Sequence, residues 1–129
     1  MAKRKTKMKE TLSKIHDIYE NNSYINMELK NKAINVLNSL SNLPDCIGVG
    51  LYPRGYQFKW YRSKNEIILV ILTTFFIRFI VISDRSFLRM IDLSWRDAYI
   101  ISDIVHDFYS NPSKYFYRIF HKYCFREVK

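Results

Sequence analysis

Residues 47–83, IGVGLYPRGYQFKWYRSKNEIILVILTTFFIRFIVIS, decide the fold, because their side chains follow the two-residue alternation of β-strands and not the period of a helix. Apolar and other side chains alternate along residues 47–52 and again along 56–61, which predicts two strands. Pro53-Arg54-Gly55 lies between them and suits a turn with Pro at its first central position and Gly to close it. The sequence therefore predicts a β-hairpin here.

Two nearly uninterrupted apolar runs follow this hairpin. Residues 66–72 and 76–83 are rich in β-branched side chains, which favours a third and a fourth strand. A membrane helix, the alternative, needs about 20 apolar residues, and this run is shorter and contains Arg78. Because both strands are apolar on both faces, we expect that part of the sheet to be covered on both sides, either by helices or, on one side, by a second copy of the chain.

Helical periodicity appears on both sides of the predicted meander. Apolar side chains recur at helical spacing over residues 10–20 and 24–43, which predicts an αα-hairpin that ends before Pro44. Residues 84–93 fit either a short fifth strand or an extended crossing. A third helix is predicted over residues 94–109, where Ser94 and Asp97 resemble a capping box, and Asn111-Pro112 open a fourth. The third helix is expected to pack on the sheet through one apolar face, formed by Ala98, Ile100, Ile101, Ile104, Val105 and Phe108.

The predicted fold class is α+β, with an N-terminal αα-hairpin, a four-stranded antiparallel β-meander and two C-terminal helices. Residues 1–9 are expected to form a basic tail, with disorder confined to the first few residues. Residues 10–129 are expected to form a single globular domain, because 129 residues bury one core but not two.

The net charge of +9 is located at the two ends of the chain. The middle, residues 10–111, is electrically balanced, whereas each end carries a cluster of cations. The clusters are Lys3, Arg4, Lys5, Lys7 and Lys9 at the N-terminus and Lys114, Arg118, Lys122, Arg126 and Lys129 at the C-terminus. Two cationic ends on a neutral body suggest an anionic partner: nucleic acid, a ribonucleoprotein or an acidic protein surface.

The predicted fourth helix is the strongest candidate surface. Lys114, Arg118 and Lys122 share one of its faces, and Arg126 extends that face more weakly. Tyr115 and Tyr117 border the cations and could stack on bases. The alternative interpretation is an ordinary amphipathic helix whose cations are solvated and whose Phe side chains complete the core.

A second candidate surface is the strip formed by the first two strands. Gly48 and Gly50 lie beside Tyr52, Lys59 and Tyr61, and such a flat strip could take a base or the backbone of a partner. Glycines in strands more often allow a helix to approach closely, and we favour that interpretation.

No diagnostic catalytic or cofactor motif is present, and we expect a protein that is not an enzyme and has no cofactor or bound metal. His16-Asp17 and His106-Asp107 suggest a small metal-dependent nuclease, but adjacent residues of a helix point apart, so this is the least favoured alternative. No signal peptide is recognisable, and Cys46 and Cys124 match no metal or redox spacing. We therefore expect two reduced thiols and a cytoplasmic protein.

The stretch LYPRGYQFKWY, residues 51–61, with the apolar hairpin after it, resembles a hairpin of small uncharacterised proteins from phages and mobile elements. In those proteins a strand, a Pro-x-Gly turn and a Trp-bearing strand recur. The resemblance covers residues 47–82 and carries no known active residues. It implies a mobile-element setting, in which small non-enzymatic inhibitors of host defence, including CRISPR inhibitors, are common.

Taken together, these features predict a non-catalytic binding protein that engages nucleic acid or a ribonucleoprotein. The resemblance extends this expectation to inhibition of a host defence complex. The alternative is a protein inhibitor or antitoxin whose cationic ends dock on an acidic protein surface. A homodimer would agree with the doubly apolar strands.

Overall fold

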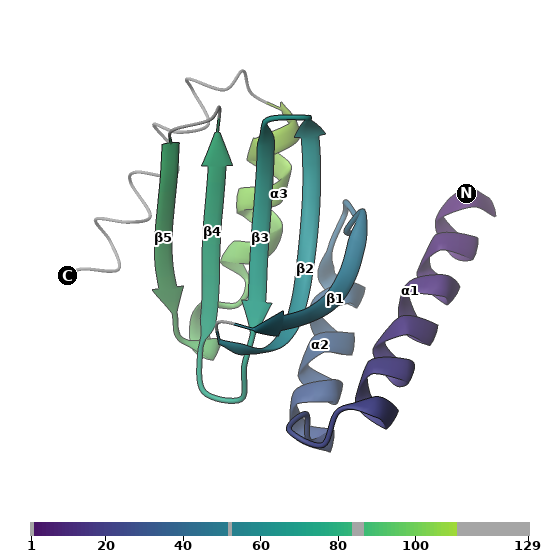
Figure 1. The fold of residues 1–129 in the computed structure, drawn as a ribbon. Helices are drawn as coiled ribbons and strands as arrows, with labels where there is room; N and C mark the ends of the chain where they lie inside the picture. Colours follow the sequence, from purple (N-terminus) through teal and green to yellow (C-terminus); the bar gives the residue numbers. More distant parts are fainter. Residues whose placement is uncertain (1, 52, 84–86, 111–129) are drawn as a thin grey trace.

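Five antiparallel strands form one sheet in the order β1-β2-β3-β4-β5, so that each strand pairs with its neighbour in sequence (Figure 1). The computed structural model describes residues 2–51, 53–83 and 87–110. The elements run in the order α1 (Ala2–Asn21), α2 (Met27–Ser39), β1 (Cys46–Leu51), β2 (Arg54–Ser63), β3 (Glu66–Leu72), β4 (Ile77–Ser83), β5 (Phe87–Leu93), a 3-10 turn (Trp95–Asp97) and α3 (Ile100–Ser110). The α+β class predicted from the sequence is confirmed.

The strand register collects the largest apolar side chains on one face of the sheet. Phe58 pairs with Val70, Val70 with Phe79, and Phe79 with Ile91, so that these four residues form one row across the sheet. Since side chains alternate between faces along each strand, the flanking rows follow the same face at every second residue. Phe58, Val70 and Phe79 are completely buried. This face is the core of the protein.

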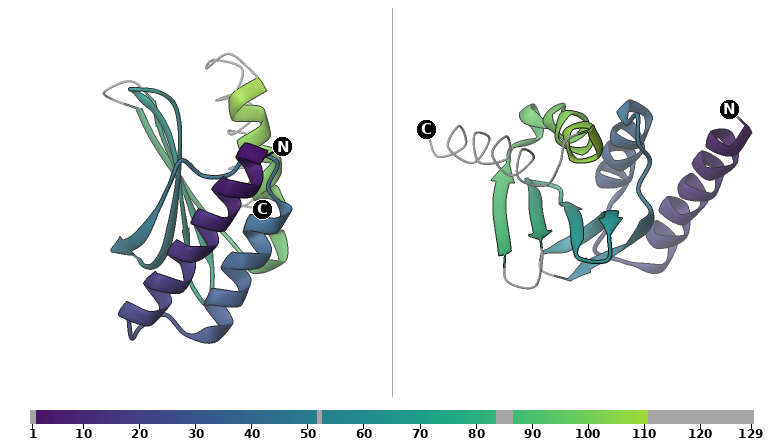
Figure 2. Two further views of the ribbon diagram at one scale, coloured as in Figure 1. Left: turned by 90° about the vertical axis from the view of Figure 1, so that its right-hand side faces the viewer. Right: turned by 90° about the horizontal axis from the view of Figure 1, so that it is seen from above.

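All three helices lie against that core face (Figure 2). Polar atoms of buried aromatic residues tie the layers together: the Tyr56 hydroxyl donates to the Ile15 carbonyl at 2.8 Å, and the Trp60 indole donates to the Asn42 carbonyl at 3.0 Å. Because a buried hydroxyl or indole N–H needs a partner, these bonds fix where the αα-hairpin sits on the sheet.

The predicted αα-hairpin is present, but its first helix starts much earlier than expected. α1 begins at Ala2 and not at Glu10, so residues 3–9 belong to a helix and not to a tail. These residues are good helix formers, and the Arg4 side chain bonds to the end of α2, which adds the tertiary contact that a charged segment lacks by itself. α2 begins at Met27 and not at residue 24, because the Asn26 side chain caps the helix by accepting from the Leu29 N–H at 2.8 Å.

The sheet has five strands, one more than the four that the sequence predicts. Residues 87–93 belong to the segment whose sequence fits either a strand or an extended crossing. They form a strand that pairs with β4 from Ser83↔Phe87 to Ile77↔Leu93. The outward-facing Arg78 and Asp92 form an ion pair across these strands at 2.8 Å. An edge strand of mixed polarity gives a weak alternation, which is why the sequence pattern was ambiguous.

The expected start of the third helix was also wrong in detail. Ser94 and Asp97 bond to each other through their side chains at 3.3 Å and flank a 3-10 turn, and the α-helix begins at Ile100. The predicted apolar face of this helix is confirmed, since its buried residues are Ile100, Ile101, Ile104, Val105 and Phe108. The fourth helix predicted from Pro112 lies outside the described residues.

Gly55 does not close the turn between β1 and β2. Leu51 pairs with Arg54, so residues 52–53 make the connection and Gly55 is a strand residue opposite Gly50. A side chain at residue 55 would collide with the backbone carbonyl of Leu72 on β3. Gly55 is therefore required because β3 approaches closely, and not because the chain turns there.

The predicted hairpin over the long apolar run is confirmed as β3 and β4. Within the residues that the structure describes, no helix is long and apolar enough to cross a membrane.

Candidate functional site

The five N-terminal cations lie on the first two turns of α1. At about 100° per residue, Lys3 and Lys7 lie on one side of the helix and Lys5 and Lys9 on the other, while Arg4 points toward the end of α2. Lys3, Lys5 and Lys9 are exposed, and none of their side chains makes a hydrogen bond or an ion pair with the residues that the structure describes. The helix therefore presents two short cationic rows to solvent.

Arg4 has a structural role. Its guanidinium donates to the Leu40 carbonyl at 2.6 Å and to the Ser41 carbonyl at 3.0 Å. Leu40 is the C-cap of α2, where unpaired carbonyls carry partial negative charge that favours a cation. Arg4 thus fastens the basic half of α1 to the end of α2.

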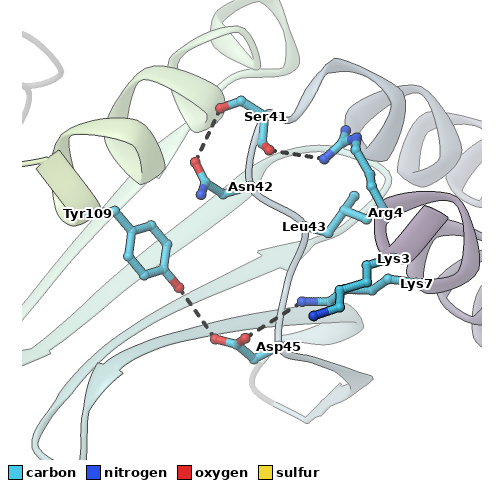
Figure 3. A pocket seen from close by; sticks show the side chains of 8 residues that line it. All are labelled: Lys3, Arg4, Lys7, Ser41, Asn42, Leu43, Asp45 and Tyr109. Carbon is cyan, nitrogen blue, oxygen red and sulfur yellow. Dashed lines mark hydrogen bonds and ion pairs between the residues drawn. The ribbon is translucent and has the colours of Figure 1, made fainter. Parts of the chain in front are cut away.

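A pocket of about 400 Å³ opens between the basic half of α1, the connection from α2 to β1, and the end of α3 (Figure 3). Three cations, one carboxylate and one phenol are among the side chains that line it. The lining residues are Lys3, Arg4, Lys7, Ser41, Asn42, Leu43, Asp45 and Tyr109. The N-terminal cations and the last turn of α3, far apart in the sequence, are therefore neighbours in space.

Asp45 connects the three elements around this pocket. Its carboxylate accepts from the Tyr61 N–H at 2.8 Å and from the Tyr109 hydroxyl at 3.4 Å, and it lies 3.7 Å from the Lys7 ammonium. The ion pair is exposed and contributes little, at most about 1 kcal/mol. Asp45 consequently offsets part of the positive charge of the pocket, and Lys7 is the lysine that it engages.

Tyr109 is held in its protonated form. Partial burial and, to a smaller extent, the neighbouring Asp45 carboxylate together raise its pKa to about 12. The single hydroxyl hydrogen is shared between the Asp45 carboxylate and the Tyr61 carbonyl, which lies 3.1 Å away, and the phenolate could make neither bond. Tyr109 therefore serves as a hydrogen-bond donor at neutral pH and has no role as a base.

We expect stability to fall as the pH rises from about 10 to about 12, because burial raises the pKa of both Tyr56 and Tyr109 to about 12. Between the unfolded value of 10.0 and these values, the unfolded chain loses protons that the folded chain keeps, so the stabilisation present below pH 10 is lost as the pH increases. Midpoints of urea unfolding measured between about pH 10 and about pH 12 test whether stability falls as the pH rises. Tyr56→Phe and Tyr109→Phe should each flatten the fall, and a constant midpoint in the wild type would contradict the prediction.

The two glycines of the second candidate surface have different surroundings. A side chain at Gly50 would meet Ile71 at 2.8 Å, as the packing interpretation requires, although the approaching element is β3 and not a helix. Gly48 has open space around it. Lys59 lies over the Tyr61 ring at 5.6 Å on the face of the sheet away from the helices, and Tyr52 lies outside the described residues.

The C-terminal candidates also lie outside the described residues. These are Lys114, Arg118, Lys122, Arg126, Tyr115 and Tyr117.

The sequence reasoning missed Asp45 and Tyr109. No periodicity marks either residue, since Asp45 follows Pro44 in a connection and Tyr109 lies on the last turn of α3. Their importance comes from contacts with residues that are distant in the sequence, Lys7 and Tyr61.

The His–Asp pairs do not form a cluster with other metal-ligand residues in the part of the chain that the structure describes, where no three His, Cys, Asp or Glu residues are grouped to hold a metal ion. The His106 side chain is mostly exposed, with its ring 3.9 Å from the adjacent Asp107 carboxylate. Cys46 is a free, exposed thiol. In comparisons with known proteins, no family model matches this chain, and neither a curated protein nor a solved structure is significantly similar to it.

Proposed function

We propose that this protein is a non-catalytic binder of a polyanion, nucleic acid or a nucleoprotein, which it engages with the basic half of α1 together with the cations that follow α3. The single observation that carries the proposal is the pocket shared by Lys3, Lys7 and Tyr109. It brings the last turn of α3, which precedes the C-terminal cations in the sequence, beside the N-terminal cations.

The available charge favours contacts that do not depend on sequence. Lys3, Lys5 and Lys9 are exposed and free of partners among the described residues, whereas Arg4 and Lys7 are engaged by carbonyls and by Asp45. On a helix with a rise of about 1.5 Å per residue, Lys5 and Lys9 are about 6 Å apart along the axis. Flexible lysines at this spacing can neutralise neighbouring phosphates and release their counterions.

A fluorescence-anisotropy titration with single-stranded RNA, single-stranded DNA and duplex DNA at several salt concentrations tests the proposal. We expect micromolar or tighter binding at low salt that weakens steeply as salt rises. The double variant Lys5→Gln/Lys9→Gln should reduce the slope of log K against log salt by about 1.4 on single strands or about 1.8 on duplex DNA.

The matched control removes two charges elsewhere. Arg54 and Arg96 are exposed at the end of the sheet opposite Tyr61 and the pocket, so Arg54→Gln/Arg96→Gln lowers the net charge equally and should leave the slope unchanged. If no nucleic acid binds even at low salt, or if both double variants weaken binding equally, the proposed surface is wrong.

An acidic protein surface is the second candidate partner, and one feature of α1 favours it. A groove of about 560 Å³ with a largely apolar lining runs along the helix, and Lys5 and Lys9 lie beside Met8 and Leu12 in it. Apolar side chains bordered by lysines suit a protein partner with both apolar and acidic residues. Met8→Ser should leave nucleic-acid binding unchanged but weaken binding to such a protein.

A further inference from the structure

The face of the sheet away from the helices is mostly apolar over β3, β4 and β5. The outward-facing apolar residues that remain at least partly accessible there are Ile67, Leu69, Ile80, Ile82 and Met90, whereas Ile71 is buried beside Gly50. The register aligns Lys59, Leu69, Ile80 and Met90 in one row across the sheet. An antiparallel sheet with one solvated face normally carries polar residues there, so this face has the composition of a covered surface.

The described helices do not provide that cover. α1, α2 and α3 all lie on the opposite face (Figure 2). Leu69 and Ile80 at the centre of the outer face are partly accessible, and Met90 is 53% exposed. Strands about 4.8 Å apart and seven residues long give the apolar strands β3–β5 an area of roughly 330 Å², which is the size of a functional apolar patch, and the four strands β2–β5 roughly 450 Å².

Charge distribution favours a second copy of this chain as the occupant. The N-terminal cations lie on α1, on the helix side of the sheet, so these cations of two copies are far apart when the copies meet through their outer faces. The outer face itself carries Lys59 on β2 and the Arg78–Asp92 pair between β4 and β5. Arg78 and Asp92 neutralise each other, and Asp92 on β5 is the more exposed of the two. The exposed carboxylate and the Lys59 ammonium therefore lie toward opposite edges of the four strands β2–β5.

The position of these charges selects one of two symmetric arrangements. A two-fold axis along the strands places β2 of one copy over β5 of the other, so that Lys59 faces Met90 with Asp92 close by, and Leu69 faces Ile80. A two-fold axis across the strands places Lys59 over its own symmetry mate, which is unfavourable because like charges then meet. Both arrangements keep the strands of the two sheets nearly aligned, as packed sheets require.

We propose that the protein forms a homodimer through the outer faces of its sheets, with the two-fold axis along the strands. The two faces together bury roughly 900 Å², slightly less than the area of about 1,000 Å² typical of the smallest specific interfaces. The dimer is therefore weak, with a dissociation constant in the micromolar range. It forms without nucleic acid and does not depend on the polyanion-binding surface.

Sedimentation equilibrium of the full chain without nucleic acid, from about 1 to about 500 µM, measures this association over the micromolar range. Two substitutions at one exposed position test the geometry. Met90→Lys and Met90→Glu remove the same apolar side chain, but Met90→Lys places a cation against Lys59 of the other copy, whereas Met90→Glu places an anion there. We expect Met90→Lys to raise the dissociation constant at least about tenfold and Met90→Glu to change it less than about threefold.

Met27→Lys is the matched control, because Met27 is similarly exposed at 50% but lies at the start of α2, on the helix side. It should leave the dissociation constant unchanged. Circular dichroism and melting temperatures confirm that each variant is folded. A chain that remains monomeric at the highest concentration overturns the proposal, and the outer face is then covered by another part of the chain or by a different protein. A dimer that Met90→Lys and Met90→Glu weaken equally, or not at all, overturns the proposed arrangement.

Discussion

Gly55→Ala is expected to unfold the protein or to lower its stability by about 3 kcal/mol or more. A Cβ atom at residue 55 would overlap the carbonyl oxygen of Leu72 and lie 2.9 Å from the carbonyl carbon. These are backbone atoms of β3, which cannot rotate away as the end of a flexible side chain can. Strands β2 and β3 would have to separate at Tyr56↔Leu72, where the buried face of the sheet begins.

Thermal melts followed by circular dichroism measure this effect. A loss of about 3 kcal/mol corresponds to a decrease of roughly 10 °C in the melting temperature of a domain of this size. Gly48→Ala is the control, because a Cβ atom there meets nothing within 4 Å. Its melting temperature should remain within a few degrees of the wild type. Equal melting temperatures for the two variants would show that the close approach of β3 to Gly55 is not a constraint.

Trp60→Ala is expected to cost about 3–5 kcal/mol, because it removes the largest completely buried side chain from the centre of the core. The indole also donates to the Asn42 carbonyl in the connection between α2 and β1. Its loss leaves a cavity at the interface of the sheet and the αα-hairpin and removes a bond that holds the two layers together. The midpoint of urea unfolding should decrease strongly.

Trp60→Phe separates the two contributions. It keeps an aromatic ring but removes the N–H donor and part of the volume, so a smaller loss of about 1–3 kcal/mol is expected. Trp95 remains as the fluorescent probe of unfolding in both variants. Tyr61→Thr, at the next position on the opposite face, should cost less than about 1 kcal/mol. An equally large loss for Tyr61→Thr would contradict the assignment of the core to the face that carries Trp60.

The two surfaces proposed for binding lie on opposite sides of the sheet. The cationic rows of α1 belong to the helix layer, and the apolar face of β3, β4 and β5 belongs to the other side (Figure 2). Variants in one surface can therefore be tested without disturbing the other. Lys5→Gln/Lys9→Gln should leave dimerisation intact, and Met90→Lys should leave intact the binding of a single copy to nucleic acid.

The candidate site could be predicted from the sequence only in part. The run of lysines from Lys3 to Lys9 is visible in the sequence, and so is its excess of positive charge. The sequence does not show which of these residues are free to bind a partner. Arg4 bonds to the end of α2 and Lys7 pairs with Asp45, and both contacts join residues more than thirty positions apart. Tyr109 joins the same pocket only because α3 packs with its last turn beside the end of β2.

The sequence by itself determined the strands of the meander, the apolar stripe of α2 and the buried face of α3. These features repeat every two residues or about every 3.6, and a periodic pattern of burial is written into neighbouring residues. The same local pattern established that both faces of β3 are apolar.

Only the tertiary structure decided the helical state of residues 3–9, the fifth strand, the role of Gly55 and the side of the sheet that the helices cover. Each depends on a partner that is distant in the sequence: the end of α2 for Arg4, β4 for β5, and the Leu72 carbonyl for Gly55. Local propensity is a fraction of a kcal/mol per residue, so a single long-range contact is enough to override it.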